Sequence, residues 1–163
     1  MSISQAFIQE VKKETDSTRR LLTVINDEHL SWTPHQKSMT VAALAGHIVE
    51  LHNWISSTLA GEGIDFAAGY QSFIPTTAAE LKARLDESVE ANIATLNSLS
   101  DEDWNQLWTL RAGDHVIVSL PRIAAVRFLI QNHLIHHRGQ LSVYLRMLDL
   151  PIPGMYGPSA DER

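Results

Sequence analysis

Four long segments of this chain repeat apolar residues at the three- and four-residue spacing of an α-helix. The second segment, for example, has an apolar face formed by Val41, Leu44, Ile48, Leu51, Ile55 and Leu59. An amphipathic helix buries such a face against neighbouring helices. The four segments cover approximately Ile3–Ile25, Val41–Leu59, Ala78–Leu99 and Pro121–Leu148. The pattern therefore predicts an all-α protein, folded as an antiparallel four-helix bundle.

A β-prone stretch interrupts this pattern before the last helix. Its two runs, Trp108–Leu110 and Val116–Val118, flank the turn-forming residues Ala112–Asp114. We expect a small hairpin or an extended loop there. The tail, DLPIPGMYGPSADER, contains three prolines and two glycines and should be irregular. A chain of 163 residues has the usual size of one domain, so residues 1–163 are expected to form a single domain.

Composition excludes several kinds of site and partner. The net charge is −6 and no basic cluster exceeds two residues, which argues against nucleic acid as a partner. The chain has no cysteine, so a metal site would need His, Asp, Glu or water as ligands. No apolar run reaches the roughly 18 residues of a membrane span, and the polar N-terminus does not resemble a signal peptide. A cytoplasmic protein without membrane contact is expected.

The stretch NHLIHHRGQ carries the main functional signal. His133 and His137 are four residues apart on the last predicted helix, so their side chains lie one above the other. His47 borders the apolar face of the second helix and could supply a third ligand. Three neutral imidazoles would hold a divalent metal and leave one position open for water or substrate. We therefore predict a metal site formed by His47, His133 and His137, with catalytic residues unknown.

Other polar residues near these positions have simpler explanations. His136 lies about 100° around the helix from His137 and should face away from the same metal, and HLIHH lacks the glutamate of the metalloprotease motif HExxH. We expect His52 at the surface, with the mouth of the pocket as the alternative. We also expect Glu50 at the surface, with support of a metal ligand or action as a general base as the alternatives. Arg138 is expected to form a surface salt bridge.

Two aromatic residues and one glycine in the predicted helices lie near the candidate ligands in the sequence. Trp54 and Tyr144 are expected in the core or in a pocket wall. Gly139 inside a helix suggests either a close helix crossing or a nearby ligand.

The C-terminal stretch NHLIHHRGQLSVYLRMLDLPIPGMYGPSADE closely resembles that of the DinB family, in the DinB/YfiT-like superfamily. The segments LAGHIVELHNWI and WTLRAGDHVIVSLPR resemble the same family, in the same order. The resemblance implies a four-helix bundle, often homodimeric, with a three-histidine divalent-metal site. Its ligands would be His47, His133 and His137, and the metal would be nickel, zinc, iron or manganese.

The resemblance leaves three functions open. Some relatives are thiol S-transferases or isomerases that use a low-molecular-weight thiol such as bacillithiol or mycothiol, and the absence of cysteine is compatible with a nucleophile supplied as a cofactor. The second function is hydrolysis by a metal-activated water, assisted by Glu50 or His52. The third is a non-enzymatic metal-binding stress protein. A small-molecule substrate or thiol is the expected partner, and a homodimer the expected assembly.

Overall fold

Ser2, Thr40 and Thr77 begin three long helices in the computed structural model, which describes residues 2–162. Each side-chain oxygen accepts a hydrogen bond from the backbone N–H three residues later. These bonds satisfy donors that a helix otherwise leaves unpaired at its start. The three helices are α1 (Ile3–Leu22), α2 (Val41–Ala60) and α3 (Ala78–Ser98). They match the first three predicted segments closely.

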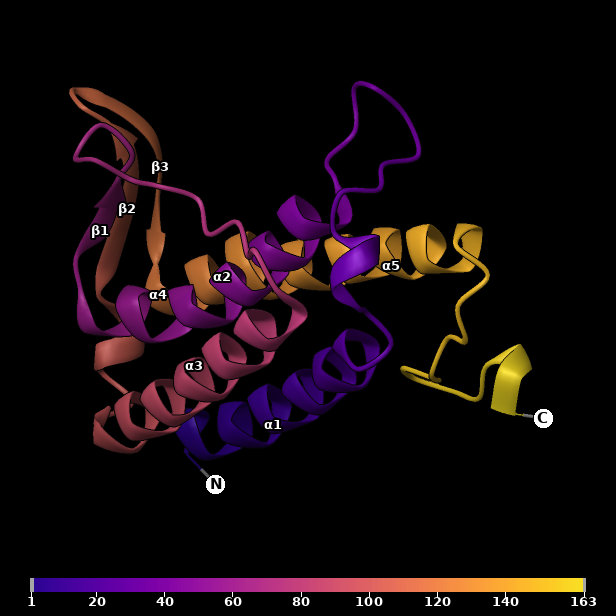
Figure 1. Ribbon diagram of the computed structural model, residues 1–163. Helices are drawn as coiled ribbons and strands as arrows, with labels where there is room; N and C mark the ends of the chain where they lie inside the picture. Colours follow the sequence, from indigo (N-terminus) through magenta and orange to yellow (C-terminus); the bar gives the residue numbers. More distant parts are fainter. Residues whose placement is uncertain (1, 163) are drawn as a thin grey trace.

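Two hydrogen bonds define how these helices run. The backbone N–H of Ala42 donates to the carbonyl of Leu30, and that of Ala78 donates to Oδ1 of Asp27. Both α2 and α3 therefore begin beside the end of α1, run antiparallel to it and run parallel to each other. The predicted antiparallel arrangement does not hold for the pair α2–α3, because residues 61–77 return along the bundle before α3 begins (Figure 1).

The fourth long helical stretch has three parts. They are α4 (Arg122–Ala124), a π-helical segment η3 (Ala125–Gln131) and α5 (Asn132–Met147). Val126, Ile130 and Leu134 follow one another at four-residue intervals and are all buried, so this stretch keeps one face in the core across the change from π to α geometry. This π segment replaces part of the predicted continuous helix and ends directly before the histidine motif, and π segments are frequent at functional sites.

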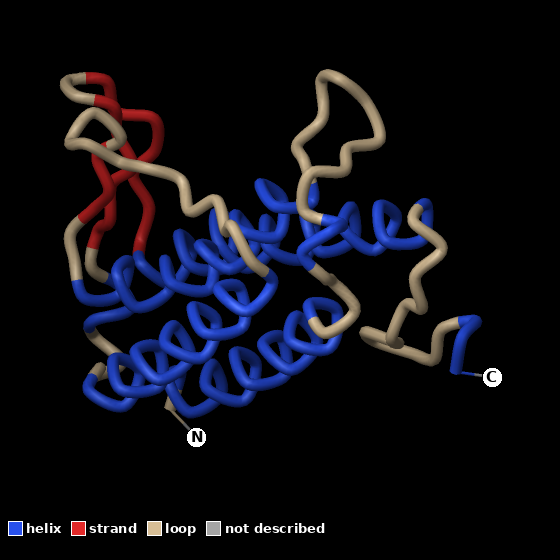
Figure 2. Tube along the Cα trace, in the orientation of Figure 1, coloured by secondary structure: helices blue, strands red, loops and turns tan. Residues whose placement is uncertain are grey.

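A small sheet covers one end of the bundle (Figure 2). Strands β2 (Leu107–Ala112) and β3 (His115–Pro121) form an antiparallel hairpin, which confirms the hairpin prediction. Strand β1 (Gly63–Asp65) pairs with β2 in parallel. The sequence did not predict β1, since three residues are too few to show strand alternation. The purely all-α prediction is thus corrected to a helical bundle with a three-stranded sheet.

Helix α2 is the most enclosed element of the bundle, because α3 packs on one side of it and α5 with η3 on another. Thirteen of its 20 residues are buried, including Glu50 and His52. Within residues 2–162, no helix combines the length and apolar character needed to cross a bilayer.

The C-terminal stretch is irregular, as predicted, except for a short 3₁₀ helix, η4 (Ala160–Glu162). Asp161 forms an ion pair with Arg146 of α5, and Glu162 accepts a hydrogen bond from the backbone of Gly154 at 2.7 Å. These bonds fold the tail back on itself and fasten it to the end of α5.

Candidate metal centre

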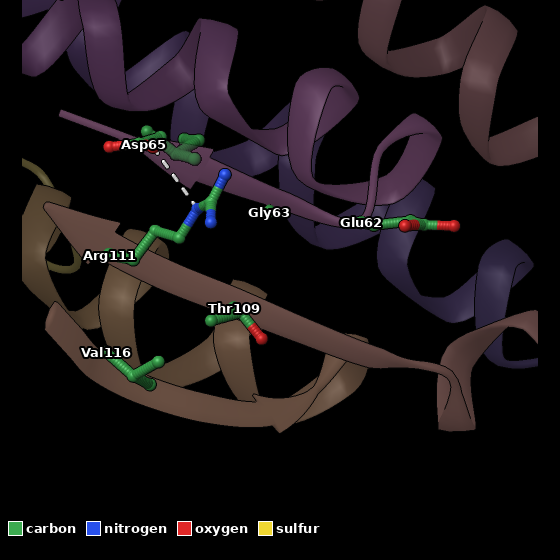
Figure 3. A pocket seen from close by; sticks show the side chains of 7 residues that line it. Glu62, Gly63, Asp65, Thr109, Arg111 and Val116 are labelled. Carbon is green, nitrogen blue, oxygen red and sulfur yellow. Dashed lines mark ion pairs between the residues drawn. The ribbon is translucent and has the colours of Figure 1, made fainter. Parts of the chain in front are cut away.

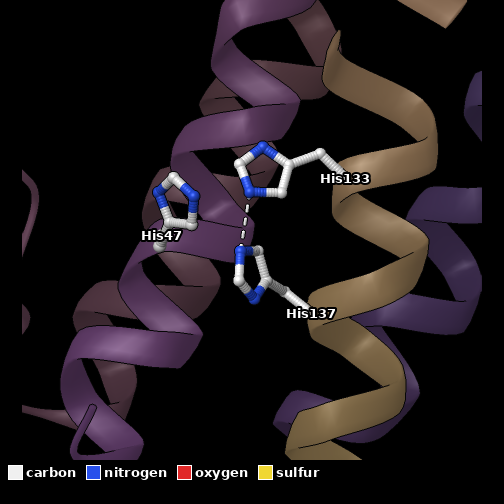
Figure 4. A group of neighbouring side chains, drawn as sticks. All are labelled: His47, His133 and His137. Atoms are coloured by element: carbon white, nitrogen blue, oxygen red, sulfur yellow. Dashed lines mark hydrogen bonds between the residues drawn. The ribbon is translucent and has the colours of Figure 1, made fainter. Parts of the chain in front are cut away.

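Three histidines from two helices converge beside the bundle core. His47 extends from α2, and His133 and His137 extend from α5, one turn apart (Figure 4). The ring centroid of His47 lies 5.0 Å from that of His133 and 5.0 Å from that of His137, and the latter two centroids are 4.5 Å apart. One nitrogen atom from each ring lies within 4.8 Å of the other two. The structure therefore brings together the three residues that the sequence selected.

In two of the rings, Nδ1 lies close to a side-chain oxygen of a neighbouring residue. Nδ1 of His137 lies 2.7 Å from Oε1 of Gln140, and Nδ1 of His47 lies 3.4 Å from Oε2 of Glu50. An oxygen that accepts from Nδ1–H fixes the ring orientation and leaves Nε2 unprotonated as the atom that binds a metal. Both contacts thus prepare the rings for ligation. Sequence analysis named Glu50 as one alternative partner of a ligand but missed Gln140, which its three-residue spacing from His137 could have indicated.

The pKa values of two of these imidazoles are lowered. Burial, with smaller contributions from the rings of His137 and His47, lowers the pKa of His133 to about 4, although a hydrogen bond with the backbone of Leu129 acts in the opposite direction. Burial also lowers the pKa of His137, against an opposing hydrogen bond with Gln140. Both rings are therefore neutral near pH 7, the state in which imidazole binds metals.

Nε2 of His133 and Nε2 of His137 face each other at 2.7 Å (Figure 4). When Nδ1 of each neutral ring carries the proton, both Nε2 atoms present lone pairs, which repel at this distance. A shared proton or a cation removes the repulsion. Since His47 adds a third nitrogen, the residues fit a divalent ion with three protein ligands and an open coordination position.

Glu50 connects this cluster to the loop that follows β1. It is 8% exposed, and its Oε1 accepts a hydrogen bond from the backbone N–H of Phe73 at 2.7 Å. The hydroxyl of Tyr70 donates to the same carboxylate at 3.2 to 3.3 Å. The prediction of a solvated Glu50 is wrong, and its role is that of a partner to His47. One carboxylate therefore links a candidate ligand to a loop.

An apolar pocket of about 470 Å³ opens beside the histidines. His47 and His133 form part of its wall, together with four aromatic residues, Trp54, Phe66, Tyr70 and Trp108. Its volume is within the range of small-molecule sites. Trp54 thus has the predicted wall position, and Tyr144 packs against the core as predicted. The cluster and the pocket form one continuous site.

A model of the DinB family matches residues 1–163 of the chain. The chain belongs to the DinB family. A curated relative, the uncharacterized protein YrdA of Bacillus subtilis strain 168, is 29% identical over 156 residues, which are 96% of this chain and 89% of YrdA.

Solved DinB-like structures have the same fold. A DinB-like protein from Bacillus cereus ATCC 10987 is 28% identical, with a TM-score of 0.72 over 93% of this chain and 97% of the other. The DinB-like protein YjoA of Bacillus subtilis is 18% identical, with a TM-score of 0.70 over 96% of this chain and 97% of the other. The second likeness concerns the fold alone.

His52 of this DinB protein does not lie at the surface, as the sequence predicted, or at the pocket mouth. It is 1% exposed, and its Nε2 lies 2.9 Å from the hydroxyl of Thr18. Burial, with smaller contributions from the positive charges of Arg138 and Arg19, lowers the pKa of His52 to about 3. It is a neutral residue of the core that contacts α1 and does not line the pocket beside the three histidines.

Arg138 is likewise buried, so the predicted surface salt bridge is corrected to an internal one. Its guanidinium pairs with Glu14 of α1 and also donates to Thr18 and to the hydroxyl of Tyr156. The residue therefore joins α5 to α1 and to the C-terminal tail.

The remaining positions are at the surface. His136 is exposed and is not part of the histidine cluster, although its ring centroid lies 5.1 Å from that of His137. Gly139 is exposed and has no atom of residues 2–162 within 4 Å of the place where a Cβ would lie, so no close helix crossing explains it.

A second pocket, of about 460 Å³, lies at the small sheet and is separate from the histidine site (Figure 3). Arg111 and Asp65 form an ion pair across it at 3.2 Å, and Thr109 and Val116 lie nearby. None of the three histidines lines it. Its side chains are already paired or exposed, and it offers no group of nitrogen ligands.

Proposed function

We propose that this protein is a metal-dependent transferase that joins a low-molecular-weight thiol to an organic electrophile. His47, His133 and His137 would hold one divalent ion, either nickel, zinc, iron or manganese. The observation that carries the proposal is a cluster of imidazoles, two with lowered pKa values, that opens directly into an apolar pocket. A divalent ion held there would keep a thiol in its nucleophilic thiolate form near neutral pH.

The chain's own residues have distinct roles in this proposal. Glu50 and Gln140 orient the rings of His47 and His137. The apolar wall excludes water and positions the electrophile. The thiolate sulfur attacks an electrophilic carbon, a C–S bond forms, and the leaving group departs with the electron pair of the broken bond. Because the chain has no cysteine, the sulfur nucleophile must come from a separate molecule.

The hydrolytic alternative has weaker support. Both side chains that could assist water activation, Glu50 and His52, are committed elsewhere. The oxygens of Glu50 accept from Phe73 and Tyr70, and His52 bonds to Thr18 inside the core. A non-enzymatic stress role gives no reason for the adjoining pocket.

The test follows consumption of 1-chloro-2,4-dinitrobenzene with cysteine, coenzyme A, bacillithiol and mycothiol in turn. Metal-loaded protein should accelerate the reaction with at least one thiol, and release of chloride should match formation of the thioether. His137→Ala should abolish the acceleration, whereas His136→Ala, at the neighbouring exposed position, should retain it. Equal rates for wild type and His137→Ala with every thiol would contradict the proposal.

A further inference from the structure

The pocket beside the histidines has two walls from different parts of the fold. One wall comes from the bundle, where Trp54 lies on α2 and Leu129 on η3. The other comes from strand β2 and the loop after β1, through Leu110, Trp108 and Phe66. The site therefore depends on the loop and sheet being held against the bundle.

Two contacts hold the loop in this position. Glu50 accepts the backbone N–H of Phe73 at 2.7 Å, which fastens the loop to α2 three residues beyond His47. Gly46 lies directly under the loop, because a Cβ there would be 2.2 Å from the carbonyl oxygen of Phe73 and 2.9 Å from Cδ of Pro75. The loop wall is thus tied to the same turn of α2 that carries His47.

The charge of the lining restricts what the pocket accepts. Among residues 2–162, no lysine, arginine or acidic side chain lines it, so in the metal-free pocket a charged group would lose its hydration without gaining an oppositely charged partner. The rings of Trp54, Phe66 and Tyr70 contact one another, with centroids 5.2 to 6.1 Å apart. This is the spacing of packed aromatic pairs, which leaves no gap between the rings for a cation.

We propose that this pocket binds the uncharged apolar or aromatic part of the substrate and selects against charged groups. The inference rests on the proposed transferase function, since it names the substrate class of that site. The electrophile would place its apolar portion among Trp54, Phe66 and Trp108 and its reactive carbon toward His47 and His133. A volume of about 470 Å³ accommodates a molecule of one or two rings.

Strand β2 supplies a matched pair of variants. Trp108 and Leu110 of this strand line the histidine pocket, whereas Thr109 and Arg111 line the pocket on the other face. Val116 pairs with Arg111 in the register and shares that other face. Leu110→Glu therefore places a carboxylate in the proposed site, and Val116→Glu places one on the same sheet outside it.

The experiment measures binding of three naphthalene probes by titration calorimetry, using the full chain freed of metal by a chelator. The probes are neutral 2-naphthalenemethanol, anionic 2-naphthalenesulfonate and cationic 2-naphthylmethylammonium. Wild type should bind the neutral probe at least tenfold more tightly than either charged one. Leu110→Glu should weaken neutral binding at least tenfold, and Val116→Glu should leave it within twofold. Ser72→Glu, on the exposed loop wall, replaces Leu110→Glu if circular dichroism shows that the latter is unfolded.

Equal binding of all three probes, no binding of the neutral probe, or equal losses in folded Leu110→Glu and Val116→Glu would overturn the inference. Metal content and thiol-dependent turnover are measured on the same preparations. Turnover without neutral-probe selectivity rejects the substrate class and leaves the transferase standing. If the protein binds the neutral probe selectively but never binds metal, the proposed transferase function is rejected. The inference that the pocket binds the substrate of that transferase is then rejected as well.

Discussion

Nε2 of His133 and Nε2 of His137 lie 2.7 Å apart across one turn of α5. When Nδ1 of each neutral ring carries the proton, the two Nε2 lone pairs face each other, and a cation held between them removes their repulsion. The pKa of His133 is lowered to about 4, which disfavours an additional proton near pH 7. The pair is therefore suited to hold a metal ion, with His47 completing the set of ligands.

The contact between His137 and Gln140 predicts a specific effect on metal affinity. Gln140→Leu removes the oxygen that accepts from Nδ1 of His137 and should weaken metal binding roughly 10- to 100-fold. Gln140→Glu keeps an acceptor and should retain the affinity. Competition with a chelator of known affinity measures the difference, and equal affinities of the Leu and Glu variants would refute this role.

Gly46 and Gly139 predict opposite responses to the same substitution. Gly46→Ala should destabilise the protein by about 1–3 kcal/mol despite the better helix propensity of alanine, since its Cβ would overlap the carbonyl of Phe73. Gly139→Ala meets nothing within 4 Å and should stabilise by up to about 1 kcal/mol. Urea unfolding of both variants checks the pair. A more stable Gly46→Ala would show that the loop does not press on α2.

The ion pair between Arg138 and Glu14 should contribute far more to stability than an exposed pair. Glu14→Ala leaves a buried guanidinium without its carboxylate and should cost about 3–5 kcal/mol of unfolding free energy. The matched control is Glu10→Ala, which breaks a solvent-exposed pair with Arg127 and should cost at most about 1 kcal/mol. The double variant Glu14→Ala with Arg138→Met should recover part of the loss. Equal costs for Glu14→Ala and Glu10→Ala would contradict the buried role.

His52 predicts a loss of stability in acid. Its pKa is about 3 when folded and about 6.5 when unfolded, so only the unfolded chain gains a proton between these values. The stability present above pH 6.5 should fall with decreasing pH, by up to about 1.4 kcal/mol per pH unit from this residue. His52→Gln should show a shallower fall between pH 6.5 and 5 when urea unfolding of metal-free protein is compared. Parallel curves for both proteins would exclude His52 as the cause.

The helices and the three histidines could be predicted because both follow helical spacing. The four-residue interval between His133 and His137 places both rings on one face, and His47 borders the apolar face of α2. Strand β1 and the π segment could not be predicted, since one is three residues long and the other shares the apolar spacing of the surrounding α-helix.

The polar residues around the site show that the position of a residue on a helical face is not enough to predict whether its side chain is buried. Glu50, His52 and Arg138 were predicted at the surface, yet all three are buried. Helix α2 is enclosed on most sides, so it has no broad solvent face on which to place Glu50 and His52. The sequence did contain an indication that Glu50 is buried, because Glu50 is the only charged residue in the 20 residues of α2. Its partners Tyr70 and Phe73 lie in a loop whose path the sequence does not specify.

Elemental analysis of untagged protein by plasma mass spectrometry tests the metal site most directly, with His137→Ala and His136→Ala measured alongside. His136 is the appropriate control because it adjoins His137 but is exposed. The account predicts about one divalent ion per chain in wild type and in His136→Ala, and its loss in His137→Ala. Wild type that binds no metal after reconstitution with nickel, zinc, iron and manganese, or His137→Ala that retains a full complement, would contradict it.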